Sequence, residues 1–200
     1  MQRYSDIAFT PAVQECQIER GSYEHYQDAA AASPPEGLGP DEIAFLTERD
    51  SFYLASVGEN GWPYVQHRGG PPGFITILDP THLAWVERPG NKQYVSAGNL
   101  TNEDKIAIIA VDYANRLRLK LYGHARFDPK PNPAALGQIS HTGRVEGLMT
   151  VEVVAYSWNC PKFITPRYTA DQVRSITDQL LMKVQRLEDE IALLAKSTPA

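Results

Sequence analysis

The chain has 200 residues, of which 42% are hydrophobic and 22% are charged, and its formal net charge at pH 7 is -5. This length suits one domain of moderate size with enough apolar side chains to build a core. A mild negative charge without a basic stripe argues against nucleic-acid binding, and no apolar run is long enough to cross a bilayer.

The N-terminal sequence and the cysteines favour a cytoplasmic protein. Residues 1–13, MQRYSDIAFTPAV, lack the order of charged, apolar and small residues that marks a signal peptide. Cys16 and Cys160 are the only cysteines, and two reduced thiols fit better than a lone disulfide. Because the sequence has no CxxC, no HExxH and no cluster of histidines, we expect no zinc site.

The N-terminal segment predicts a helical lead-in followed by a linker. Residues 11–32 are typical of polar helix, and SPPEGLGP, residues 33–40, has the composition of a linker. Pro40 stands where a helix favours its first residue, and the two acidic residues after it suit the positive end of the helix dipole. The segment PDEIAFLTERD, residues 40–50, therefore predicts a short helix with one apolar face.

Short β-strands with tight turns are predicted for the middle of the chain. The dipeptide Asn60-Gly61 is the strongest short hairpin signal, and it separates two of them. The segment RLRLKLYGHARF alternates basic and apolar residues, with Arg116, Arg118 and Lys120 on one face. The predicted strands are 52–57, 62–68, 73–78, 82–87, 106–113, 116–127 and 149–158. Six or seven such strands predict a closed antiparallel barrel rather than a parallel α/β sheet.

The C-terminal segment predicts a long amphipathic helix over residues 171–196. Its apolar residues recur three or four positions apart in a narrow stripe: Val173, Ile176, Leu180, Val184, Leu187, Ile191 and Leu194. This stripe either packs on the chain's own barrel or pairs with a second copy of itself. The chain is thus predicted to have a lead-in and linker (1–39), a barrel (40–168) and a C-terminal helix (169–200).

The first of three basic segments is QHRGGPPG, residues 66–73, where a predicted strand stops at consecutive glycines. Gly69 and Gly70 leave backbone N–H groups uncovered by side chains, so that a flat or anionic ligand can approach the main chain closely. Arg68 offers a planar fork of donors that suits a phosphate. The alternative interpretation is a surface loop that turns the chain at a barrel corner.

Two further segments carry cations that suit the same kind of ligand. Residues 91–93 follow a Pro-Gly turn and are predicted to open a helix, whose N-terminus suits an anion. The alternative is a capped helix with an exposed lysine. The cations at the start of strand 116–127 either face something negative or form a solvated outer face. With Trp85 or Trp158 available to pack on a ring, the residues favour a phosphate-bearing ligand on a β-barrel.

In this order, the motifs resemble the pyridoxamine 5'-phosphate oxidase-like flavin-binding split barrels. The resemblance rests on GWPYVQHRGGPPGF, LAWVERPGNKQY, a strand ending in VDY, and RLRLKLYGHARF, and it covers residues 40–160. The phrase WNCPKFITPR, residues 158–167, further resembles a subgroup of small bacterial members. The family implies a mainly β fold, a six-stranded antiparallel split barrel with flanking helices. It also implies a homodimer with two equal sites along the subunit interface.

The resemblance implies FMN as the cofactor and identifies residues that contact it. Residues 66–70 would run beside the isoalloxazine and the ribityl chain, and residues 85–87 match the second flavin-lining strand. Residues 91–93 match the segment that grips the phosphate. The start of strand 116–127 matches one that reaches over from the partner subunit, and residues 158–159 match positions near the ring. The implied cofactor-binding residues are Gln66, His67, Arg68, Gly69, Gly70, Trp85, Val86, Glu87, Asn91, Lys92, Gln93, Arg118, Lys120, Trp158 and Asn159.

The resemblance implies an FMN-dependent oxidoreductase that acts on a small organic substrate or a nicotinamide. Gln66 and Pro71 stand roughly where true pyridoxamine-phosphate oxidases carry an arginine and a lysine, and their C-terminal substrate segment has no counterpart here. Synthesis of pyridoxal phosphate is therefore not expected. We assign no catalytic residue, because His67 and His124 suit structural hydrogen bonds as well as proton transfer. The alternatives are a flavin-binding carrier or sensor without turnover, and a split barrel that binds a deazaflavin or, through His67, haem.

Overall fold

The computed structural model describes residues 1–31 and 33–197, and the chain divides into two compact units. The first unit comprises Met1–Asp112 and Leu117–Lys162, and it holds the lead-in, the linker and every strand of the sheet. The second unit comprises Tyr113–Arg116 and Phe163–Ala200, and it contains the C-terminal helix.

The first unit has six short helices. They are α1 (Tyr4–Ala8), α2 (Pro11–Glu19), α3 (Tyr23–Ala31), α4 (Pro40–Thr47), α5 (Val95–Asn99) and α6 (Pro133–Leu136). The polar helix predicted over 11–32 is two helices, because the chain turns at Gly21, whose φ is +68°. Residue 32 lies outside the described residues. Helix α4 begins at Pro40 as predicted, and the Glu42 carboxylate accepts a hydrogen bond from the Gly39 N–H at 2.9 Å.

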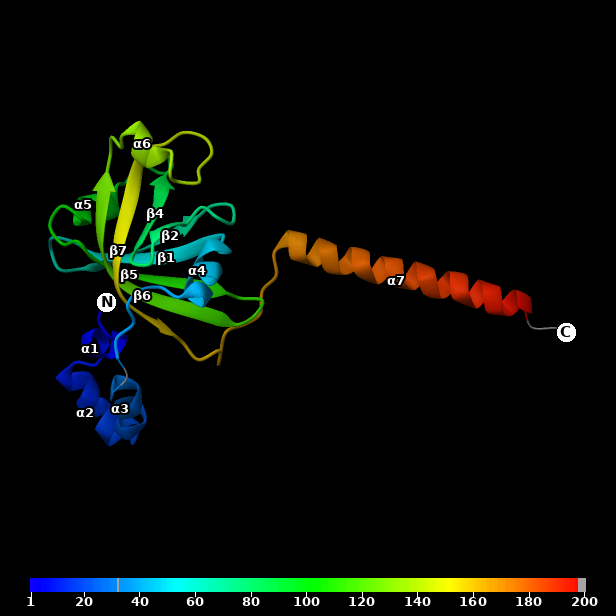
Figure 1. The fold of residues 1–200 in the computed structure, drawn as a ribbon, viewed down its shortest axis with the longest axis horizontal. Helices are drawn as coiled ribbons and strands as arrows, with labels where there is room; N and C mark the ends of the chain where they lie inside the picture. The colour runs from blue at the N-terminus through cyan, green and yellow to red at the C-terminus, as the bar shows by residue number, and fades with distance from the viewer. Residues whose placement is uncertain (32, 198–200) are drawn as a thin grey trace. The chain divides into compact units, whose positions relative to one another are not determined.

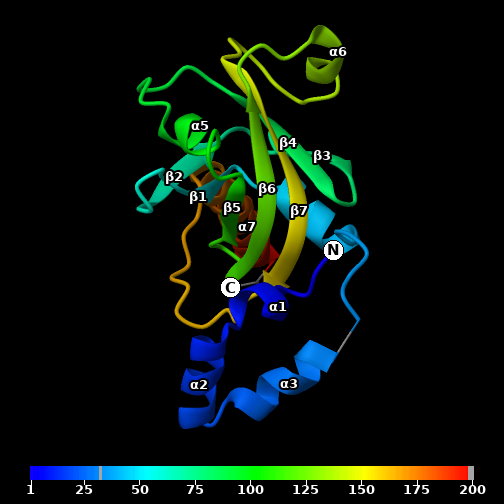
Figure 2. The ribbon, with the colours of Figure 1, turned by 90° about the vertical axis from the view of Figure 1, so that its left-hand side faces the viewer.

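Seven antiparallel strands form one sheet, in the order β2-β1-β5-β6-β7-β4-β3 (Figure 1). The strands are β1 (Ser51–Val57), β2 (Pro63–Gly69), β3 (Thr76–Asp79), β4 (His82–Glu87), β5 (Lys105–Asp112), β6 (Leu117–Asp128) and β7 (Gly147–Trp158). The mainly β split-barrel fold is confirmed. The sheet is not closed, since β2 and β3 are its two edges and no ladder among the described residues joins them. The long strands β6 and β7 run side by side across it (Figure 2).

The hairpin between β1 and β2 turns where the sequence predicted. The Gly61 N–H donates to the Gly58 carbonyl at 2.8 Å, and Gly61 has a φ of +80°, which suits glycine. Arg116, by contrast, is not on the face of β6 with Arg118 and Lys120. Its φ is +55° and it lies in the turn before the strand, so the predicted three-cation face has two members.

The core lies on the inner face of the sheet. The Phe52 ring packs edge-on against the Trp85 ring, with 4.9 Å between centroids, and both side chains are buried. Burying side chains of this size stabilises the fold by roughly 1.5–3 kcal/mol each. Leu38, from the segment interpreted as a linker, is also a core residue, and its N–H donates to the Pro80 carbonyl. The segment before α4 is therefore fixed to the sheet rather than a loose connection.

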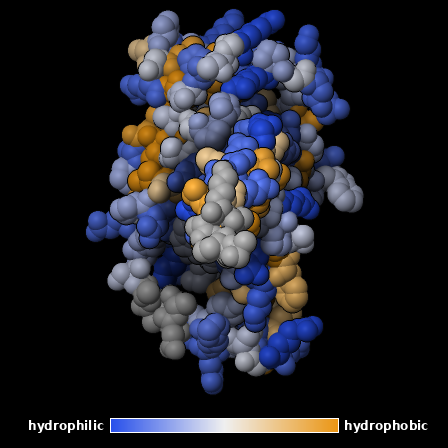
Figure 3. All heavy atoms as spheres, turned by 90° about the vertical axis from the view of Figure 1, so that its right-hand side faces the viewer, coloured by the Kyte–Doolittle hydropathy of each residue, from blue (hydrophilic) through white to orange (hydrophobic). Residues whose placement is uncertain are grey.

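The predicted C-terminal helix is confirmed as α7, Ala170–Ser197. Its described side chains, which end at Leu194, are exposed, including the apolar ones. Figure 3 views this helix nearly end-on and shows hydrophobic residues at its surface beside hydrophilic ones. Among the described residues, no helix is both long enough and apolar enough to cross a membrane.

Candidate functional site

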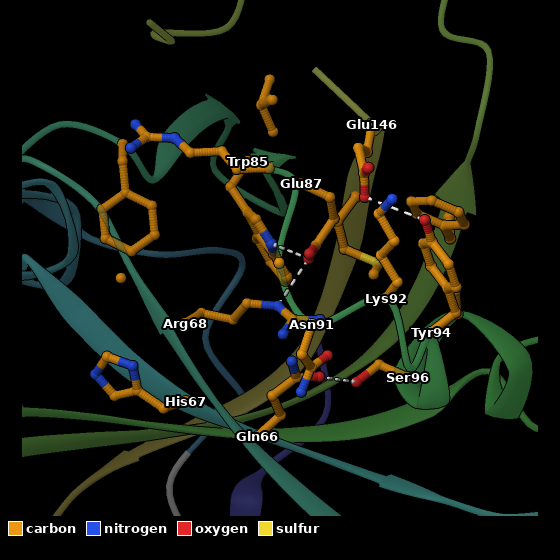
Figure 4. A pocket seen from close by; sticks show the side chains of 18 residues that line it. Gln66, His67, Arg68, Trp85, Glu87, Asn91, Lys92, Tyr94, Ser96 and Glu146 are labelled. Atoms are coloured by element: carbon orange, nitrogen blue, oxygen red, sulfur yellow. Dashed lines mark hydrogen bonds and ion pairs between the residues drawn. The ribbon is translucent and has the colours of Figure 1, made fainter. Parts of the chain in front are cut away.

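A cavity of about 320 Å³ opens between β2, β4 and the loop that leads into α5 (Figure 4). Residues 66–69 of β2 form one wall, and residues 85–88 at the end of β4 form another. The loop contributes Gly90, Asn91 and Lys92. The remaining lining residues are Phe74, Tyr94, Ser96, Ala97, Phe127, Glu146 and Met149. The fold thus brings together three of the segments that the family resemblance implies for FMN.

An ion pair joins the two strand walls of the cavity. Arg68 Nε donates to Glu87 Oε1 at 2.8 Å, and Trp85 Nε1 donates to the same oxygen at 2.7 Å (Figure 4). The side chains of Arg68 and Glu87 are only 13% and 17% exposed, so the attraction is little screened by solvent. Within the described residues, no hydrogen bond occupies the terminal guanidinium nitrogens of Arg68. They remain available to a ligand.

Gln66 and Arg68 lie on the opposite face of β2 from His67. The register pairs them with Leu54 and Phe52, which are buried on the core side. The His67 ring packs edge-on against the Tyr53 ring, with 5.6 Å between centroids. His67 borders the cavity, but its ring packs against Tyr53 on the face of β2 away from Gln66 and Arg68. This contact supports the structural interpretation of His67.

The glycine pair after Arg68 has a packing reason. Gly69 is the last residue of β2, pairs with Ser51 and lines the cavity. Gly70 does not line it. A Cβ on Gly70 would lie 2.5 Å from Cγ of Phe74, so the close approach of that ring excludes any other residue. The Gly70 N–H donates to the Asp50 carbonyl at 2.8 Å and is therefore not open to a ligand, and the packing of Phe74 on Gly70 fits the barrel-corner alternative.

The loop from Arg88 to Tyr94 does not open a helix at Asn91. Helix α5 begins at Val95, so the predicted helix start was wrong. Lys92 and Tyr94 instead adopt left-handed conformations, with φ of +60° and +52°, and the Asn91 side chain accepts a hydrogen bond from the Gln93 N–H at 3.2 Å. Residues other than glycine rarely adopt this left-handed backbone conformation, which costs about 1–3 kcal/mol per residue. The loop places Asn91 and Lys92, but not Gln93, at the cavity.

Sequence reasoning missed the residues that close the far side of the cavity. The buried Ser96 hydroxyl donates to Gln66 Oε1 at 3.0 Å, which fixes the amide and leaves its NH₂ group as a donor. The Tyr94 hydroxyl donates to Glu146 Oε2 at 3.4 Å. A second hollow shares Tyr94 and Glu146 with this cavity and adds Arg144. No short motif marks these residues, because they reach the site through long-range strand pairing and the loop conformation.

Besides Gly70 and Gln93, four of the implied FMN residues lie outside this cavity, at the start of β6 and at or just after the end of β7. The Asn159 N–H donates to the Arg118 carbonyl at 3.1 Å. Arg118 Nε and Asn159 Oδ1 are both buried, yet neither has a hydrogen-bond partner within the described part of the chain. A buried polar atom without a partner costs about 1–3 kcal/mol. Lys120 borders an apolar hollow of about 220 Å³ that also involves Tyr53 and Val65.

Trp158 is held at α4 rather than at the cavity. Its Nε1 donates to Glu42 Oε1 at 2.5 Å, and its ring packs edge-on against the Phe45 ring, with 4.8 Å between centroids. Burial, and after it the nearby Glu42 carboxylate, raises the pKa of Tyr156. Glu42 thus accepts hydrogen bonds from both the start of α4 and the end of β7.

The comparisons with known proteins agree with this fold. The family profile described as Pyridoxamine 5'-phosphate oxidase matches residues 40–155, and the chain belongs to this family. None of the curated proteins compared with the chain matches it.

Solved structures with a similar fold come from several bacteria. HupZ of Group A Streptococcus is 15% identical, with a TM-score of 0.46 over 66% of this chain and 100% of that one. A Clostridium acetobutylicum protein related to general stress protein 26, of the pyridoxinephosphate oxidase family, is 13% identical, with a TM-score of 0.46 over 60% and 85%. An FMN-binding protein from Syntrophomonas wolfei is 9% identical, with a TM-score of 0.45 over 72% and 97%. These values assign neither a ligand nor an activity.

Proposed function

We propose that the chain binds FMN in the cavity between β2 and β4 and acts as an FMN-dependent oxidoreductase on a small organic substrate or a nicotinamide. One observation carries this proposal. Residues 66–69, 85–87 and 91–92, which are separate in sequence, line a single cavity. They belong to the segments that the family resemblance implies for FMN, and family membership supports the same assignment.

The charges around the cavity fit a phosphorylated, flat ligand. Lys92 and Arg88 line it, and neither forms an ion pair within the described residues, while Arg68 has terminal donors to spare. These cations would hold the phosphate. Phe127 and Tyr94, which line the cavity and are not buried, give an apolar surface for a ring, whereas Trp85 packs in the core and is 1% exposed. The volume of about 320 Å³ lies at the lower end of the usual range for ligand sites, which is consistent with one wall coming from a second subunit.

When bound, a flavin would supply the redox chemistry, hydride acceptance followed by reoxidation. The chain's residues bind and orient it. Gln66, fixed by the Ser96 hydroxyl, presents N–H donors to the cavity, and such a donor would stabilise negative charge on the reduced ring. Gln66 and Pro71 still stand where pyridoxamine-phosphate oxidases carry basic residues, so the proposed reaction is not pyridoxal phosphate synthesis.

The proposed functional form is a homodimer, with each site at the subunit interface. Arg118 supports it, because its side chain is partly exposed and its buried Nε has no partner in the described chain, so that nothing holds the guanidinium away from a second subunit's ligand. Exposed apolar side chains on β1 and β2 also support it, since Tyr53 and Val65 border an apolar hollow. Arg118 and Lys120 would then reach the partner's cavity.

The proposed location is the cytoplasm. Cys16 and Cys160 are exposed free thiols, which suit a reducing compartment.

The visible spectrum of the purified protein, with the mass of any released ligand, tests the cofactor. We expect the two visible bands of a flavin and the mass of FMN. A haem spectrum, or the mass of a deazaflavin, would replace FMN with one of the alternatives. Protein that stays colourless and does not bind added FMN would contradict the proposal.

Anaerobic mixing with reduced nicotinamide then tests turnover. We expect the bound flavin to bleach faster than free FMN does under the same conditions. If no reduced nicotinamide or small organic donor bleaches it, the protein is a flavin carrier or sensor, and the oxidoreductase part of the proposal fails.

A further inference from the structure

Helix α7 carries a heptad repeat. Two kinds of position, three residues and then four residues apart, alternate from its first turn to Leu194, and from Leu180 onward all of them are apolar, whereas Thr177 is polar. The a positions are Ala170, Thr177, Val184 and Ile191, and the d positions are Val173, Leu180, Leu187 and Leu194. A repeat of seven residues averages 3.5 residues per turn, whereas a straight helix has 3.6. A heptad repeat that continues over the length of the helix therefore predicts that the helix supercoils around another helix.

The side chains at these positions also suit one particular arrangement. Val184 and Ile191, at a, are β-branched, and every d position from Leu180 onward is leucine. This division favours a parallel two-stranded coiled coil, in which a meets a and d meets d. The a and d side chains Val173, Leu180, Val184, Leu187 and Ile191 are between 44% and 66% exposed. A large apolar surface on one helix is left in water.

The flanking positions match across a parallel pair. In such a pair, a g residue faces the e residue five positions later on the partner helix. Lys183 at g then faces Glu188 at e, and symmetry repeats this opposite-charge contact on the other side. One heptad earlier, Ile176 at g faces Leu181 at e, and both are exposed apolar side chains. Charge and apolar surface are both complementary to a second copy of the same helix.

We propose that α7 pairs with α7 of a second chain as a parallel, two-stranded coiled coil. The apolar stripe, which Ile176 and Leu181 widen in one heptad, would by itself also suit packing on the chain's own barrel. The β-branched residues at a with leucine at d, and the Lys183 to Glu188 match, favour a partner helix of the same sequence instead. The pairing is independent of whether the barrel binds flavin.

A pair of single-cysteine chains tests the pairing in the full-length protein. Cys16→Ser and Cys160→Ser remove the native thiols, and Val184→Cys then places one thiol at an a position. The matched control is Leu193→Cys, at an outer c position of the same exposed helix. We expect the chain with Val184→Cys to form a disulfide-linked dimer about tenfold faster than the control. Equal rates would mean that a barrel dimer merely brings two helices close, and would overturn the proposal, as would no crosslink from either chain.

Charge exchange tests the parallel orientation. In a redox buffer, we measure the equilibrium between the free thiol and the disulfide at residue 184. Lys183→Glu places two carboxylates opposite each other and should lower dimer formation severalfold, and adding Glu188→Lys should restore it. In an antiparallel pair, g positions face g positions and e positions face e positions, so Lys183→Glu would face another g residue such as Glu190, and Glu188→Lys, at an e position, would not relieve that repulsion. Failure of the double variant to recover would therefore overturn the parallel arrangement.

Discussion

Two arginine–carboxylate pairs in the barrel have nearly the same burial and different surroundings. Arg49 and Asp112 are 10% and 12% exposed, and Arg68 and Glu87 are 13% and 17% exposed. Arg49 is fully engaged: its Nε donates to the Phe45 carbonyl, its terminal nitrogens contact Asp112 and Glu48, and its guanidinium lies 4.4 Å from the centre of the Phe45 ring. Arg68 commits only its Nε, to Glu87, and faces a cavity.

The difference indicates different roles for similar pairs. Arg49 joins α4 to the end of β5, and each of its three nitrogens contacts a protein acceptor, so the pair is a structural link. The spare donors of Arg68 have no use in the folded chain by itself. Burial and charge alone therefore do not identify a binding arginine. The N–H donors that it leaves without a protein partner do. The predictions below test this distinction.

The largest expected effect is on folding. Asp112→Ala would leave Arg49 buried without its carboxylate, and we expect a loss of about 3–5 kcal/mol in the free energy of unfolding. Urea denaturation followed by circular dichroism measures it. The matched control is Asp6→Ala, which removes an exposed ion pair with Arg3 and should cost less than about 1 kcal/mol. Equal costs for the two variants would mean that the Arg49 pair is no structural link.

The next effect is on FMN affinity. Arg68→Ala or Lys92→Ala should each weaken FMN binding by about 1.5–3 kcal/mol, because each removes a charge-assisted hydrogen bond to the phosphate. Fluorescence titration of the free protein with FMN measures the dissociation constant. Lys130→Ala, which removes an exposed lysine away from the cavity, is the control. If affinity is unchanged in both cavity variants, the anion of the cofactor binds elsewhere.

A smaller effect is expected at the partner of Arg68. Glu87→Gln keeps an oxygen that can accept from Trp85 Nε1 but removes a negative charge from the cavity wall. We expect FMN to bind about threefold more tightly, since Arg68 is then no longer neutralised. The same titration measures this change. Binding weakened as strongly as by Arg68→Ala would show instead that Glu87 acts mainly by orienting Arg68.

The smallest effect concerns the exposed pair of Asp79 and His82, which serves as a comparison for the two buried arginine–carboxylate pairs. Hydrogen bonds from the Thr81 backbone N–H and hydroxyl, and then from His82, lower the pKa of Asp79 to about 2. A lowered pKa in the folded state stabilises the fold above the ordinary aspartate pKa, and this contribution is lost as the pH falls toward 2. Nuclear magnetic resonance titration of the Asp79 carboxyl measures it. Thr81→Ala should raise the pKa part of the way, and an ordinary pKa in the unaltered chain would contradict the assignment.

The fold was predictable because its signals are local or periodic. Asn60-Gly61 marked the hairpin, Pro40 marked the start of α4, and the apolar spacing of the C-terminal segment marked α7. The expected closure of the barrel was not predictable, since strand alternation does not say which edges pair. Leu38 was interpreted as linker because the surrounding prolines and glycines hide a single core residue.

The sequence predicted the strand walls of the candidate site and the loop residues Asn91 and Lys92, but not the conformation of that loop. Residues 66–69 and 85–87 carry a recognisable order of residue types, and the cavity lies between them. Lys92 and Tyr94 adopt left-handed backbone conformations that a sequence marks only when the residue is glycine. The loop was therefore predicted as the start of a helix. Ser96 and Glu146 come to the site through tertiary structure alone. The ion pair of Arg68 with Glu87 was missed because the partners lie on different strands.

The burial of Trp85 against the cavity gives the protein an internal optical reporter. Trp85 is 1% exposed and lines the site, whereas Trp62 at the β1–β2 hairpin is 74% exposed. Emission from an indole in an apolar environment is shifted to the blue, and iodide in solution cannot reach it. A chromophore in the cavity would quench Trp85 most strongly by energy transfer, because Trp85 lines the cavity and Trp62 and Trp158 do not, while iodide would quench the exposed Trp62 and the partly exposed Trp158. Ligand binding and solvent accessibility can thus be followed in one emission spectrum without an added label.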